Sequence, residues 1–173
     1  DISANQNYLR IFENSALRCT VISNYPSDES LYDIFYRLNS GSTPLSSQEL
    51  RQALNKGPFS EYLIMVTDED NVLRRVMNLK EPDKRLRDVE VLLRCMSFLR
   101  YSMDYKGNLL QFLDKTTRLF NEKWETEESD IRELEDRVMI IIDKLIRVFG
   151  SCQAVARKYK NGEQNTQFNR VIL

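Results

Sequence analysis

Four polar residues flank one loop and have the side-chain types that bind phosphate or carboxylate groups. Arg37 and Asn39 precede a loop rich in Gly, Ser and Thr, and Glu49 and Arg51 follow it. Arginine presents a planar fork of donors that matches phosphate and carboxylate, and an asparagine amide both donates and accepts hydrogen bonds. If the chain folds back at the loop, the four side chains lie close together. This segment is therefore the first candidate for a ligand site.

The same residues also have a structural interpretation. Asparagine tolerates the left-handed backbone at a helix C-terminus, which suits Asn39. Ser46 and Glu49 fit a capping box, in which each side chain bonds to the other residue's backbone N–H group. The residues alone therefore favour structure over a site, and the loop 40–45 is too long for a helix-turn-helix motif.

A second group of charged residues occurs in the segment "KRLRDVEVLLR", residues 84–94. Glu90 and Arg94 are four positions apart on one expected helix face, which suits an ion pair. Arg85 and Asp88, three positions apart, could extend that pair into a network. Such a network either binds a ligand or joins two helices, and the spacing leaves both interpretations open.

Absent residue types exclude several chemistries. The chain has no histidine, so it contains no histidine-dependent triad, HNH-type nuclease site, histidine-ligated zinc or histidine general base. It also has no P-loop, dinucleotide-binding, Cys-x-x-Cys or calcium-loop motif. Cys19, Cys95 and Cys152 lie far apart, which predicts reduced core thiols and no metal site. The sequence shows no complete catalytic set.

Composition predicts a soluble, cytoplasmic protein, with 42% hydrophobic residues, 29% charged residues, a net charge of −1 and no segment long enough to span a membrane. The charge is unevenly spread. Residues 74–100 contain eight bases and four acids, whereas residues 122–136 contain eight acids and two bases. These segments can be solvated helix faces, or the basic one can be a surface for a phosphate backbone.

Apolar spacing predicts a mainly α fold, a bundle of about six to eight helices with one unpaired β-strand near the N-terminus. The strand is expected at 17–21, where apolar and polar residues alternate. Tyr8, Leu9 and Phe12 should face inward from the first helix, and Gly150 should end the longest one. Helices are expected at 3–13, 28–38, 46–55, 59–67, 85–103, 109–124 and 127–149, with a short amphipathic piece around 155–159.

The ends of the chain predict a fragment. It begins with Asp1 and ends in an apolar "VIL". We therefore expect residues 1–173 to be a single helical domain cut at both ends. Residues 1–25 would lead from a missing N-terminal half, and residues 26–173 would form the bundle.

Two segments together resemble a known family, the GmrSD-type restriction-endonuclease N-terminal domain, which is related to ParB and sulfiredoxin. The segment "KRLRDVEVLLRCMSF" is similar to the family's Arg-x-x-Asp-x-Glu-x-x-x-Arg helix, at Arg85, Asp88, Glu90 and Arg94. "LLQFLDK" and "VFGSCQAVARKY" are also similar to later family helices. The segment "IFYRLNSGSTPLSSQELRQALNKGPF" resembles the family's hallmark, which corresponds to Phe35, Arg37, Leu38, Asn39, Gly41, Leu45, Ser46, Glu49, Leu50, Arg51, Gly57 and Phe59.

The resemblance implies nucleotide-dependent restriction of foreign, often modified DNA in bacterial defence. The family's catalytic half carries an Asp-Gly-Gln-Gln-Arg-type motif, and many members add an HNH nuclease domain. Neither that motif nor any histidine occurs here. The chain would then be the helical C-terminal part of the module, inactive alone and without a cofactor of its own. Its partners would be the missing N-terminal half and, through the parent protein, DNA, with a nucleoside triphosphate and a divalent metal bound in that parent.

The resemblance also implies roles for individual residues. Arg37 would contact phosphate, Asn39 would fix the loop or hydrogen-bond the ligand, and Arg51 would add a second cation. Further ligand or DNA candidates are Arg85 and Arg94. The residues expected to shape the motifs are Phe35, Gly41, Ser46, Glu49, Asp88 and Glu90.

Two other functions stay open on the sequence. The acidic and basic segments could make the chain a helical protein-interaction or oligomerisation module that also associates with itself. Alternatively, the bases between Arg74 and Arg100 could make it a helical domain that binds DNA without sequence preference.

Overall fold

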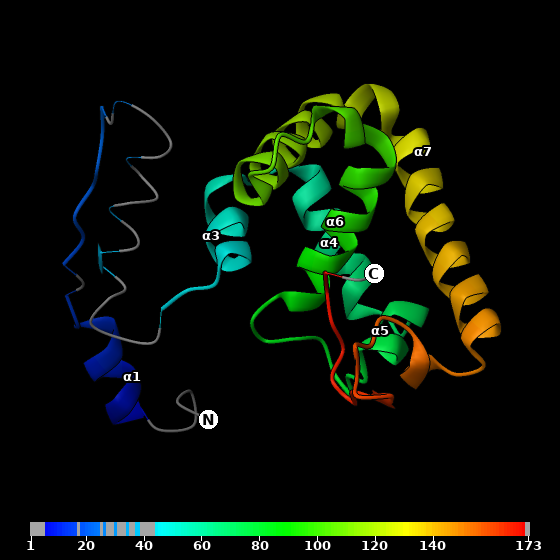
Figure 1. The fold of residues 1–173 in the computed structure, drawn as a ribbon. Coiled ribbons are helices and arrows are strands. Elements are labelled where there is room, and N and C mark those ends of the chain that lie inside the picture. The colour runs from blue at the N-terminus through cyan, green and yellow to red at the C-terminus, as the bar shows by residue number, and fades with distance from the viewer. Residues whose placement is uncertain are drawn as a thin grey trace. The chain divides into compact units, whose positions relative to one another are not determined.

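The chain divides into two units, residues 1–35 and residues 36–173, and each is described by itself. Figure 1 shows the computed structural model as a ribbon. The structure describes residues 6–16, 18–24, 26, 30, 34, 37–38 and 44–171. The helix expected at 28–38 falls mostly outside this part of the chain, and within it residues 30, 34, 37 and 38 are helical.

The first unit contains the helix α1, Gln6–Glu13. The prediction that its apolar residues face inward is wrong for Tyr8 and Phe12, whose exposed fractions are 62% and 69%. The β-strand expected near the N-terminus is also wrong, because residues 18–24 have no regular secondary structure. Val21, in the middle of that segment, is exposed. Alternating polarity produces a strand only where a neighbouring strand satisfies its backbone groups, and none does so among the described residues.

The second unit confirms the mainly α fold. Its central helix, α6, contacts α3, α4, α5 and α7, and this arrangement is visible in Figure 1. Val89, Leu92, Leu93 and Met96 of α6 are buried at the helical spacing that predicted them. The helices of this unit are α3 (Ser47–Leu54), α4 (Pro58–Asp68), α5 (Val72–Met77), α6 (Arg87–Tyr101) and α7 (Leu109–Phe149), with the 3-10 turns η2 (Ser102–Asp104) and η3 (Cys152–Ala154).

The helix α7 bends at the point where two helices were expected to meet. Glu127 has non-helical backbone angles, φ −127° and ψ 20°. Its carboxylate forms an ion pair with the Lys123 ammonium at 3.1 Å and also pairs with Arg100 of α6. Figure 1 shows the two halves of α7 running in different directions on either side of this bend. Gly150 ends the helix with φ 80°, as predicted.

The C-terminal segment differs from the expectation. The short amphipathic piece expected around 155–159 lies between η3 and a small hairpin, β1 (Tyr159–Lys160) paired antiparallel with β2 (Glu163–Gln164). Asn161 and Gly162 form its turn, with φ values of 54° and 82°. Asn-Gly is the preferred pair for a two-residue hairpin turn because both positions need positive φ. Strand structure therefore lies near the C-terminus rather than the N-terminus.

Candidate functional site

The two segments that carry the family resemblance meet in space. We call the contact between them the motif corner, formed by Pro44, Ser46, Glu49 and Arg85. The Ser46 hydroxyl donates to the Arg85 carbonyl at 3.2 Å, and Arg85 Nη2 donates to the Pro44 carbonyl at 2.5 Å. Arg85 Nε lies 3.0 Å from Glu49 Oε2, although its N–H is not aligned for a hydrogen bond. The corner therefore attaches the residues before α3 to the residues before α6.

The capping box predicted at the start of α3 is confirmed. The Ser46 N–H donates to Glu49 Oε2 at 2.5 Å, and the Glu49 N–H donates to the Ser46 hydroxyl at 3.1 Å. Burial by itself raises the pKa of Glu49. The hydrogen bonds from Ser46 and the charge of Arg85 outweigh it, so the pKa of Glu49 lies below its ordinary value. Glu49 is thus an ionised structural carboxylate at neutral pH.

Arg51 lies in a buried ion pair between α3 and α7. Its Nε donates to Asp114 Oδ1 at 2.6 Å, and its Nη1 donates to the side chain of Gln48. The Arg51 side chain is only 1% exposed. A guanidinium this deeply buried holds helices together and does not reach a ligand in solvent. We therefore assign Arg51 to the packing of α3 on α7 rather than to the second cation of a ligand site.

Arg85 and Asp88, which were expected to form one network with Glu90 and Arg94, bond to other residues. Because α6 begins at Arg87, Arg85 lies outside the helix and does not share a helix face with Asp88. Asp88 Oδ2 instead accepts from the Asp83 N–H at 2.9 Å, and Asp83 Oδ1 accepts from the Arg85 N–H at 2.8 Å. Asp83 Oδ2 also binds Arg87 Nε at 2.7 Å. These bonds hold the turn that leads into α6.

The ion pair predicted between Glu90 and Arg94 is confirmed, and it includes a residue that the spacing did not indicate. Glu90 Oε1 binds Arg94, and Glu90 Oε2 lies 3.3 Å from Arg170 Nη1. Arg94 Nη1 also donates to the Arg170 carbonyl at 3.4 Å. We call these three side chains the Glu90 cluster. It joins α6 to the C-terminal segment.

The remaining motif residues fall into two groups. Arg37 is exposed and helical, whereas Phe35, Asn39 and Gly41 lie outside the described residues. Gly57 and Phe59 pack against α7. A Cβ on Gly57 would lie 2.5 Å from the amide oxygen of Asn121, and the Phe59 ring stacks on Phe120 with centroids 4.5 Å apart.

Sequence reasoning missed two polar residues of α7 that position these motifs, Asp114 and Asn121. The Asn121 oxygen accepts from the N–H groups of Phe59 and Ser60 at 3.0 and 3.2 Å, which caps the start of α4. Its amide donates to the Asn55 carbonyl at 3.2 Å. A signal was available, because positions 114, 117 and 121 form a polar stripe at helical spacing beside the apolar one.

Comparison with known protein families, with curated proteins and with solved structures gave no match to this chain. Among the helices that the structure describes, none combines the length and the apolar character needed to cross a membrane. The described residues also contain no group of three or more Cys, Asp or Glu side chains arranged to hold a metal ion. The resemblance and the geometry of the motif corner therefore remain the basis for a function.

Proposed function

We propose that this chain is the helical part of a GmrSD-like, nucleotide-dependent DNA restriction protein that acts in the cytoplasm against foreign DNA. The observation that carries the proposal is the motif corner. Ser46 and Arg85 stand 39 positions apart in sequence, belong to the two segments that resemble one family, and contact each other. A site shared by the two segments would require this proximity.

In this proposal the chain supports a catalytic site that lies mainly elsewhere. The family resemblance would place the nucleotide and its divalent metal in another part of the parent protein. This chain would contribute phosphate contacts from the segment ahead of α3, where Arg37 is exposed. The motif corner would fix the end of that segment at Pro44 and Ser46. Arg37 would then bind phosphate through its fork of donors, and Asn39 would hold the loop or the ligand.

Hydrolysis of nucleoside triphosphate by the full-length gene product tests the proposal. Arg37→Ala should lower the rate at least tenfold, because one charged donor to a phosphate is removed. Arg75→Ala is the matched control, since Arg75 is an exposed arginine on α5, and it should leave the rate unchanged. Thermal unfolding followed by circular dichroism should be the same for both variants.

Two outcomes would count against the proposal in different ways. Normal hydrolysis by Arg37→Ala removes the assignment of Arg37. A wild-type protein that hydrolyses no nucleoside triphosphate and cleaves no DNA removes the family assignment itself. The gene sequence upstream of Asp1 gives an independent check, because an Asp-Gly-Gln-Gln-Arg-type motif is expected there.

A second candidate function is a helical interaction or oligomerisation module. Exposed apolar side chains on the second half of α7, among them Ile140, Val148 and Phe149, favour it. Light scattering at several salt concentrations tests this function, and a monomer at every concentration would contradict it. The DNA-binding alternative has less support, because Arg85, Arg87, Arg94 and Arg100 all form ion pairs within the chain.

A further inference from the structure

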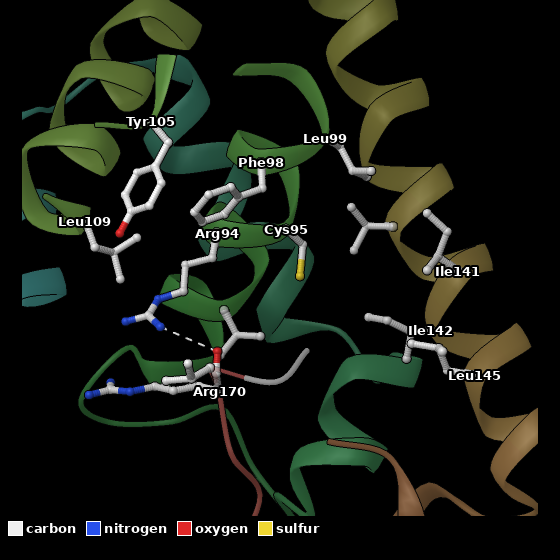
Figure 2. Close-up of a pocket in the computed structure, with 13 residues that line it drawn as sticks. Arg94, Cys95, Phe98, Leu99, Tyr105, Leu109, Ile141, Ile142, Leu145 and Arg170 are labelled. Atoms are coloured by element: carbon white, nitrogen blue, oxygen red, sulfur yellow. Dashed lines mark hydrogen bonds between the residues drawn. The ribbon is translucent and has the colours of Figure 1, made fainter. Parts of the chain in front are cut away.

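A pocket of about 450 Å³ lies between α6 and the second half of α7. This volume is within the range of small-molecule sites. Figure 2 shows Ile141, Ile142 and Leu145 projecting from α7 toward α6, with the Cys95 thiol pointing into the space between the helices. The lining residues are Val91, Arg94, Cys95, Phe98, Leu99, Tyr105, Leu109, Val138, Ile141, Ile142, Leu145, Arg170 and Val171.

The polar groups of this pocket gather on one side. Arg94 and Arg170 lie on the side away from the second half of α7, and Figure 2 shows the Tyr105 hydroxyl on that side as well. The wall formed by α7 is entirely aliphatic. A pocket with one cationic end and one apolar wall is complementary to a ligand that has an anionic head and a hydrocarbon tail.

The charge at the cationic end is not balanced within the cluster. Arg94 and Arg170 both pair with the single carboxylate of Glu90, so the Glu90 cluster carries one excess positive charge. The bonds made by Arg170 are long, at 3.3 Å from its Nη1 to Glu90 and 3.4 Å from its carbonyl to Arg94. Arg94 Nε is buried and has no hydrogen-bond partner among the described residues. Arginine donors in a partly desolvated site gain most from an added anion.

Cys95 belongs to the apolar wall rather than to any covalent chemistry. Burial raises the pKa of the Cys95 thiol to about 11, so the thiol is neutral at physiological pH. A neutral buried thiol behaves as a small apolar group. The pocket is therefore built for binding and not for nucleophilic attack.

We propose that this pocket binds an aliphatic carboxylate, with its head on Arg170 and Arg94 and its chain along Val138, Ile142 and Leu145. One excess positive charge matches one carboxylate, whereas a phosphate monoester brings up to two negative charges. This inference goes beyond the proposed restriction function and does not depend on it.

Titration calorimetry with saturated carboxylates of eight, ten and twelve carbons, each below its micelle concentration, tests the proposal. Affinity should rise about fourfold for each added CH₂ group until the chain fills the pocket. Decanol has the same chain as decanoate without the charge, and it should bind at least tenfold more weakly. Decyl phosphate should bind no more tightly than decanoate, and tenfold tighter binding would overturn the choice of a carboxylate.

Variants locate the binding site. Arg170→Ala should weaken decanoate at least tenfold, and Ile141→Asp should do the same by placing a charge on the apolar wall. Arg147→Ala is the matched control, because Arg147 is an exposed arginine of α7 outside the pocket, and it should leave the affinity unchanged. Equal binding to Arg170→Ala and wild type, or no binding of any of the three carboxylates, would overturn the proposal.

Alkylation of the cysteines gives a second measurement of the same site. At pH 9 decanoate should slow the alkylation of Cys95 at least threefold, as followed by peptide mass spectrometry. Cys152 does not line the pocket and serves as the internal control, so its rate should stay the same. Slowing of both cysteines, or of neither, would contradict binding in this pocket.

Discussion

Two groups of arginines in the second unit differ in how their charge is balanced. Near α3, Arg51 pairs with Asp114 at 2.6 Å and Arg85 with Glu49 at 3.0 Å, so each arginine has its own carboxylate. In the Glu90 cluster, two arginines share one carboxylate. The first group joins helices and the motif corner, whereas the second forms one end of a pocket.

Arginines of the same two family-like segments thus differ in charge balance. Arg51, Arg85 and Arg94 all belong to the two segments that resemble the family, and all were candidates for ligand contact. Matching charge one to one makes an arginine part of the scaffold, because no donor with an uncompensated charge is left for a ligand. At the Glu90 cluster arginines outnumber carboxylates, so one uncompensated positive charge is left to attract an anionic ligand.

The largest expected effect comes from breaking the matched pair. Asp114→Ala leaves the Arg51 guanidinium buried without its carboxylate. Removing one partner of a buried pair costs about 3–5 kcal/mol, so the free energy of unfolding should fall by that amount. Urea denaturation at neutral pH measures it, and an unchanged slope with urea would show that the folded state keeps its compactness.

The double variant Arg51→Met with Asp114→Leu is the control. It removes both charges and keeps apolar volume between α3 and α7, so most of the lost stability should return. A loss below about 1 kcal/mol in Asp114→Ala would mean that water reaches Arg51, and the distinction between the two groups would then fail.

The sequence predicted an ion pair of these two arginine groups only where the two partners lie close together in sequence. Glu90 and Arg94 were paired correctly because they are four residues apart on one helix. Arg51 and Asp114 are 63 positions apart, and local spacing carries no information on such a contact. Arg170, the second cation of the pocket, is 80 positions from Glu90 and was missed for the same reason.

The elements follow a similar rule. Long helices with repeated apolar positions, such as α6 and α7, were predicted, and so was the interruption near residue 127. The six-residue helix α5 was missed because it is too short to show a period. The hairpin at Asn161-Gly162 was missed although its turn signal was present, because its strands are only two residues long.

A smaller effect is expected from removing the one carboxylate of the Glu90 cluster. Glu90→Gln keeps an acceptor for Arg94 but leaves two guanidinium groups without a counter-charge. The free energy of unfolding should fall by about 2 kcal/mol, and decanoate at saturation should restore part of it. Affinity for decanoate should rise, as calorimetry would show. Weaker binding would place Glu90 in the ligand contact and reverse the charge argument.

The motif corner should show a still smaller effect that depends on pH. Glu49→Gln removes the ionised arm of the capping box and should cost about 1 kcal/mol at pH 7. Because the pKa of Glu49 is lowered in the folded state, its contribution is present above the unfolded pKa of about 4.3 and is lost as the pH falls. Denaturation at pH 7 and pH 3 should therefore show a difference between the variant and wild type that shrinks at pH 3.

Glu135 is a control, because its contribution to stability should depend on pH in the opposite direction to that of Glu49. Burial is the main cause that raises its pKa, so its contribution to stability is greatest below the unfolded pKa and is lost as the pH rises. Glu135→Gln should therefore gain stability relative to wild type between pH 3 and pH 7, whereas Glu49→Gln loses it. The same sign of pH dependence in both variants would contradict the assignment of Glu49 as an ionised cap.

The smallest effect on stability is expected for Arg170→Ala, a variant that should weaken decanoate binding at least tenfold. The Arg170 side chain is 49% exposed and its bond to Glu90 is long, so solvent screens the pair and its loss should cost less than about 0.5 kcal/mol. Urea denaturation without ligand measures this cost. Removing a scaffold arginine lowers the stability of the protein. Removing a ligand-binding arginine lowers the affinity of the protein for its ligand. A stability loss above about 1 kcal/mol with unchanged decanoate binding would make Arg170 a scaffold arginine, like Arg51 and Arg85. The cationic end of the pocket would then serve to hold the C-terminal segment against α6.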